Sequence, residues 1–152
     1  MSYTILLFLH IAAVIIWVGG MAIMHFAVRP SAVEMLEPPQ CLPFMAATLG
    51  RFFVAVSISI ITLLISGAGM LYLMTGLSRV PPSVHAMVGL GLIMMAIFGH
   101  IRFAAFPRLR RAVATAAWPD AARQLTLIRH AVAINMALGF LTVAVAILGR
   151  SA

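Results

Sequence analysis

The dominant pattern along the chain is a series of long uncharged segments joined by connections that hold all of the charge. Four such segments run over residues 3–28, 52–77, 80–101 and 131–149. A helix needs roughly 20 apolar residues to cross a bilayer, and each segment is about that long or longer. The pattern therefore predicts an all-α fold, an integral membrane four-helix bundle.

Prolines suggest where the helices begin and end. We expect Pro30 to end the first helix and Pro43 to begin the second, before its hydrocarbon-spanning part. Pro82 suits the first turn of the third helix, Pro107 follows that helix, and Pro119 starts the fourth. We predict one transmembrane domain over residues 1–152, with helices at about residues 3–28, 44–77, 81–106 and 120–149.

The composition agrees with a position in the lipid bilayer. Hydrophobic residues make up 64% of the 152 residues and charged residues only 9%, whereas a soluble domain carries about 25% charged residues. All ten basic residues are arginines that flank apolar segments, so the net charge of +7 indicates membrane topology and not nucleic-acid binding. The single cysteine, Cys41, excludes an internal disulfide bond.

The arginines are distributed unequally between the two sides of the membrane. The first and third connections and the flanking helix ends carry eight: Arg29, Arg51, Arg102, Arg108, Arg110, Arg111, Arg123 and Arg129. The other side has only Arg79 and Arg150. Because arginine-rich loops stay in the cytoplasm, we predict that both termini are periplasmic, in a multi-pass protein of the bacterial inner membrane.

Two helices carry histidines with the same spacing. His10 and His25 lie on the first helix, and His85 and His100 on the third, fifteen residues apart in each case. In a regular α-helix this spacing is about 22 Å of rise and an offset of about 60° around the axis. Because these two helices run in parallel, His10 is level with His85, and His25 with His100.

This arrangement suggests two haem b groups, one at each level. Imidazole is a good axial ligand for iron, so His10 with His85 and His25 with His100 could each hold one haem between the helices. Arginines at the inner rim, chiefly Arg29, Arg102 and Arg129, could pair the haem propionates. The protein would then be a b-type cytochrome that moves electrons across or within the membrane, with a quinone or another redox partner and a possible homodimer.

A fifth histidine, His130, leaves the inner level open to several interpretations. It opens the fourth helix, so it could replace one haem ligand, bind a propionate or a quinone, or join His25 and His100 around a metal ion. Alternatively, histidines near helix ends simply face the headgroup region, and small residues in membrane helices often serve only close packing. A partner subunit without any cofactor is therefore a further hypothesis.

Copper is the alternative to haem. Thioether ligands select Cu(I), and the chain has eleven methionines. Met70 and Met74 lie one helical turn apart and could line a path for Cu(I), although methionine also fills gaps in apolar cores. The three acidic residues, Glu34, Glu37 and Asp120, lie in connections, so no carboxylate within a span supports a proton-driven carrier. The sequence shows no nucleophile–base pair. It does not decide whether the protein is an enzyme.

The stretches "LHIAAVIIWVGGM", "RPSA" and "INMALGFLTVAVAILGR" resemble the copper-resistance D (CopD) family of four-helix membrane domains. The "VH" that opens the third helix and the "GH" that closes it are also similar to the bacterial four-helix protoporphyrinogen oxidase, whose pattern His10, His85 and His100 match. That family has a lysine and an "NE" pair where this chain has Met87 and Asn135–Met136. The two resemblances imply haem or copper handling, or a haem-dependent oxidoreductase, in the inner membrane.

Overall fold

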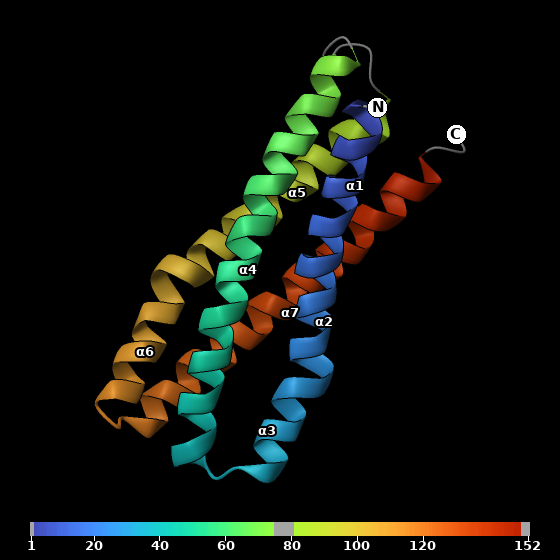
Figure 1. Ribbon diagram of the computed structural model, residues 1–152. Coiled ribbons are helices and arrows are strands. Elements are labelled where there is room, and N and C mark those ends of the chain that lie inside the picture. The colour runs from blue at the N-terminus through green and yellow to red at the C-terminus, as the bar shows by residue number, and fades with distance from the viewer. Residues whose placement is uncertain (1, 75–80, 150–152) are drawn as a thin grey trace.

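The computed structural model describes residues 2–74 and 81–149, and all regular secondary structure in these ranges is helical (Figure 1). Within them, four helical rods are long and apolar enough to cross a membrane: Ser2–Met35, Pro38–Leu73, Pro82–Ala114 and Trp118–Leu148. The all-α fold with four candidate spans, predicted from the uncharged segments, is therefore confirmed.

Two of the rods are built from several helical segments. The first consists of α1 (Ser2–Val14), η1 (Ile15–Gly19), α2 (Gly20–Ile23), η2 (Met24–Val28) and α3 (Arg29–Met35). The third consists of α5 (Pro82–His100), η4 (Ile101–Ala105) and α6 (Phe106–Ala114), while α4 (Pro38–Leu73) and α7 (Trp118–Leu148) are single helices. The three η segments are π-helical, so their backbone hydrogen bonds reach one residue further than in an α-helix.

Pro30 and Pro107 do not end their helices, contrary to the expectation from sequence. Each is the second residue of an α-helix that directly continues a π-helical segment. A proline inside a helix removes a backbone donor, and its ring clashes with the carbonyl four residues earlier. That carbonyl lies in the wider π turn in both cases, which relieves the clash. The two rods therefore extend to Met35 and Ala114.

The remaining helix ends differ less from the prediction. α4 begins at Pro38 and contains Pro43, so the second helix starts before the expected residue 44. α4 ends at Leu73, and the predicted continuation over residues 75–77 lies outside the described residues. α7 begins at Trp118, two positions before the expected start, and ends at Leu148.

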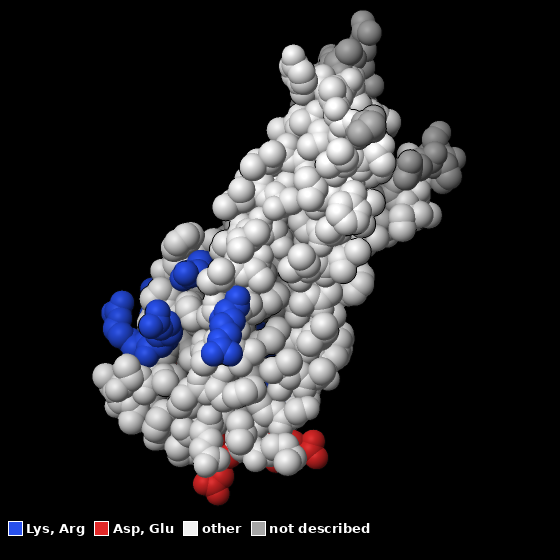
Figure 2. Space-filling model, in the orientation of Figure 1, with Lys and Arg blue, Asp and Glu red and all other residues white. Residues whose placement is uncertain are grey.

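The bundle has two different ends. α1 begins and α7 ends at one of them, here called the terminal end, whereas the α3–α4 and α6–α7 connections lie at the other (Figure 1). Figure 2 shows that the arginines gather toward that second end, here called the arginine end, with acidic side chains at its tip. The eight arginines within the described ranges all belong to its connections and flanking helices.

The interior is held by apolar packing and an aromatic cluster. α1 packs mainly on α4, α5 mainly on α7, and α6 on both α7 and α4. Phe53 of α4 lies edge-on to Phe98 and Phe106, at centroid distances of 5.6 and 5.1 Å, and Phe98 also contacts Trp17 at 6.3 Å. Large apolar side chains such as Phe103 cover the outside. This exposed apolar surface fits a protein in contact with the lipid bilayer.

Candidate metal and cofactor site

His10 is held at the interface between α1 and α4. The half-buried imidazole places its Nδ1 2.9 Å from the Oγ of Ser66, which is only 1% exposed. The Ser66 hydroxyl lies 2.6 Å from the carbonyl oxygen of Thr62 and donates its proton there. The Ser66 oxygen must then accept the Nδ1–H of His10. In the neutral form of the ring, His10 Nε2 then carries the lone pair that a metal ion could bind.

Two glycines allow α1 to approach α4 at this point. A Cβ atom on Gly67 would lie 3.5 Å from His10 Cε1, and a Cβ on Gly69 would lie 3.0 Å from Leu6 Cδ1. The first distance is ordinary contact, whereas the second is tight. The "SGAG" stretch at residues 66–69 thus provides both the hydrogen-bond acceptor and the close helix contact that position His10.

Met70 and Met74 follow Ser66 on the same face of the second rod. Steps of four residues return to nearly the same side of an α-helix, so Met70 and then Met74 follow Ser66 toward the terminal end of the bundle. Met70 is half-buried, and Met74, directly after the last residue of α4, is 41% exposed. The order from the surface inward is Met74, Met70 and then His10.

His85 and His100 occupy the two ends of α5. His85 is exposed, and its Nδ1 lies 3.3 Å from the carbonyl oxygen of Pro81 in the preceding turn. His100 is the last residue of α5 and is also exposed. α5 is α-helical throughout, so the 22 Å rise and 60° offset apply to this pair. They do not apply to His10 and His25, because η1 interrupts the α-helix between them.

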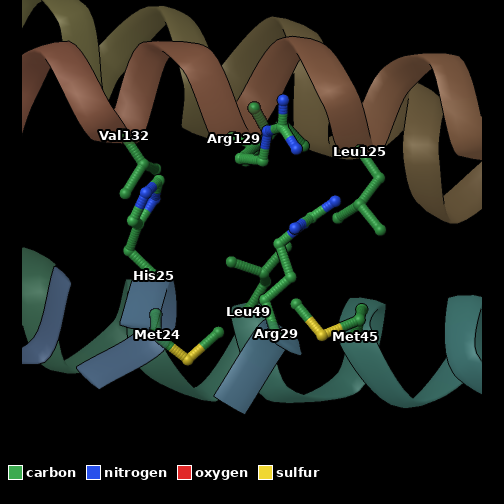
Figure 3. A pocket seen from close by; sticks show the side chains of 9 residues that line it. Met24, His25, Arg29, Met45, Leu49, Leu125, Arg129 and Val132 are labelled. Carbon is green, nitrogen blue, oxygen red and sulfur yellow. The ribbon is translucent and has the colours of Figure 1, made fainter. Parts of the chain in front are cut away.

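At the arginine end, His25 lines a hollow between the first rod, α4 and α7. Its ring packs edge-on against Phe26 at a centroid distance of 4.9 Å. Figure 3 shows His25 and Arg29 extending from η2 and α3 toward α7, which carries Arg129. Two of the three arginines predicted at this level therefore share one site with His25. The third, Arg102, lies over the Phe106 ring instead, with Cζ 5.7 Å from the centroid.

His130 is exposed beside Arg129. The Arg129 Nη2 lies 3.2 Å from His130 Nε2 and donates to it, so this ring nitrogen acts as an acceptor. Residues 2–74 and 81–149 contain no group of three or more His, Cys, Asp and Glu side chains that could hold a metal ion. The interpretation in which His25, His100 and His130 together bind a metal is therefore not supported by their positions.

Reasoning from sequence missed two buried polar residues. Ser66 determines which nitrogen of His10 is available, and its only sequence signal was its place in a small-residue stretch of an apolar span. Asn135 of α7 is 1% exposed, and its Oδ1 has no hydrogen-bond partner. A polar residue in the middle of an apolar segment is the signal that would have identified it.

The fold and these side chains define a multi-pass membrane protein with an imidazole and two thioethers at one end and an arginine-lined hollow at the other. The family model for copper resistance protein D (CopD) matches residues 46–148, which is more than half of the chain. The chain therefore belongs to the CopD family. No curated protein and no solved structure matches it.

Proposed function

We propose that this CopD-family protein binds Cu(I) as cargo at the terminal end of the α1–α4 interface. The ligands are His10 Nε2 and the Met70 thioether, and Met74 forms the entrance to the site. The observation that carries the proposal is the hydrogen bond from His10 Nδ1 to Ser66. It occupies Nδ1 and leaves Nε2 of the neutral ring for a metal ion, and Met70 follows Ser66 one turn further along α4.

The chemistry of these ligands favours Cu(I) over other common ions. Thioethers are soft donors that select Cu(I), and imidazole is a good copper ligand. Both ligands are neutral, so the occupied site carries a single positive charge. This matters within a membrane span, where charge is costly, and the described contacts of His10 are with the uncharged residues Ser66 and Gly67.

The test is a Cu(I) titration of the purified protein in detergent, with a reductant and a competing chromophoric chelator. We expect one Cu(I) per chain, and we expect Met70→Leu to weaken binding about tenfold because it removes a ligand but keeps the volume. Met35→Leu is the matched control, because Met35 is 78% exposed at the end of α3. Equal Cu(I) affinity in Met70→Leu and Met35→Leu would overturn the proposal.

A second candidate function is the di-haem cytochrome. It is favoured by the free Nε2 of His10 and by the regular α-helix that separates His85 from His100. In this arrangement His10 and His85 ligate one haem b, and His25 and His100 the other. Arg29 and Arg129, which share the hollow with His25, then pair propionates.

Colour and haem content distinguish the two candidates. A red preparation with a sharp Soret band and about two haems per chain in a pyridine haemochrome assay would favour the cytochrome, since each level offers two imidazoles. A colourless protein that binds Cu(I) would favour copper handling. One haem per chain would remove one histidine pair from the cytochrome proposal.

A further inference from the structure

The hollow at the arginine end combines positive charge with an apolar wall. Its polar lining consists of His25, Arg29 and Arg129, and its apolar wall includes Met24, Leu49 and Ile128 (Figure 3). Arg29 and Arg129 are half-buried residues whose side chains line this hollow. A guanidinium group beside an apolar wall is stabilised by an anion that accepts its hydrogen bonds.

The described part of the chain does not supply such an anion. Within residues 2–74 and 81–149, neither Arg29 nor Arg129 forms an ion pair with a carboxylate. The partner of Arg129 is the neutral acceptor nitrogen of His130. The acidic side chains in Figure 2 lie at the tip of the arginine end, beyond the arginines. Among the described residues that line it, the hollow therefore has two positively charged side chains and no negatively charged one.

A second hollow of about 250 Å³ adjoins the first. Arg29 and Leu125 line both, and the second adds the apolar side chains of Val33, Leu36 and Leu42. A positively charged centre with apolar grooves beside it fits a ligand that has one acidic group and a long apolar part. These residues lie where the first and fourth rods leave their apolar segments, which is the depth of lipid headgroups.

We propose that this pair of hollows is a binding site for an anionic phospholipid. The phosphodiester accepts hydrogen bonds from Arg29 and Arg129, and an acyl chain lies in the groove of Val33, Leu36 and Leu42. Guanidinium forks match phosphate oxygens in geometry as well as in charge. The site is separate from the proposed copper site at the other end of the bundle, and it does not depend on any bound haem.

The experiment is native mass spectrometry of the detergent-released protein with added phosphatidylglycerol, phosphatidylcholine or inorganic phosphate. We expect R29Q/R129Q to lower the affinity for phosphatidylglycerol about 30-fold. The matched control is R108Q/R110Q, which removes the same charge from exposed positions of α6 and should change the affinity less than about twofold. Inorganic phosphate at equal concentration should not displace the lipid.

A labelling measurement on the unaltered protein keeps the proposal testable if R29Q/R129Q does not fold. Bound phosphatidylglycerol should protect Arg29 and Arg129 from an arginine-selective dicarbonyl reagent and leave Arg108 and Arg110 reactive. Equal protection of all four would overturn the site, as would equal affinity for phosphatidylcholine. Displacement by inorganic phosphate would show a site for the free anion and not for a lipid.

Discussion

His10 and His25 lie on the same helical rod, yet they face opposite electrostatic surroundings. His10 contacts a buried serine and a glycine of α4, and two thioethers continue along that face. His25 shares its hollow with two arginines that have no carboxylate partner among the described residues. A cation is repelled from the second site and tolerated in the first. The same side chain can therefore serve a metal at one end and an anion at the other.

The difference also bears on how the bundle sits in the membrane. Arg29 and Arg129, which share the hollow with His25, belong to the side that the positive-inside rule assigns to the cytoplasm. Under the predicted orientation, the face around His10 lies on the periplasmic side, from which the proposed copper cargo would reach it. One distribution of charge would then determine both the orientation and the side of the proposed copper site.

The largest expected effect concerns the orientation of the bundle in the membrane, because a reporter lies either on one side or on the other. A reporter fused after Arg150 should read as periplasmic, and one inserted near Ala114 as cytoplasmic, because the arginine side is retained. Alkaline phosphatase and fluorescent-protein fusions report the two sides in living cells. The reverse pattern would place the proposed copper site on the cytoplasmic side and the arginine hollow outside.

The next effect compares the two histidines directly. His10→Ala should weaken Cu(I) binding by at least about 100-fold, because it removes the imidazole ligand. His25→Ala should leave Cu(I) affinity unchanged, since its ring lines a hollow that also holds Arg29 and Arg129, whose charges repel a cation. The chelator-competition titration measures both. Weaker binding in His25→Ala with full binding in His10→Ala would reverse the comparison.

A smaller change concerns the group that orients His10. Ser66→Ala removes the acceptor of the His10 Nδ1–H, and loss of such an outer partner costs about tenfold in metal affinity. Ser59→Ala is the control, because Ser59 is also buried in α4 but bonds only to the Ala55 carbonyl of its own helix. If both variants bind Cu(I) equally well, Ser66 has only a packing role.

The four spans could be predicted from sequence because the bilayer excludes charge, and the uncharged segments reflect that cost directly. The ends of two helices could not be predicted in this way. Pro30 and Pro107 are accommodated by π turns, which the pattern of hydrophobic residues does not predict. The partner of His10 was also beyond prediction. Membrane helices are apolar on all sides, so the hydrophobic pattern does not show which helices are neighbours. The packing of α1 on α4 is therefore seen only in the structure.

The smallest effect tests the close contact that brings His10 to α4. Gly69→Ala places a Cβ 3.0 Å from Leu6 Cδ1, so the Leu6 side chain must move by a few tenths of an ångström. Gly89→Ala on α5 is the control, because a Cβ there meets nothing within 4 Å. Both changes bring the same gain in helix propensity, so the difference isolates the contact. We expect Gly69→Ala to be less stable than Gly89→Ala by about 1 kcal/mol in denaturant unfolding. Equal stabilities would show that Leu6 yields freely, and that the hydrogen bond to Ser66, more than the glycine contact, holds His10 in place.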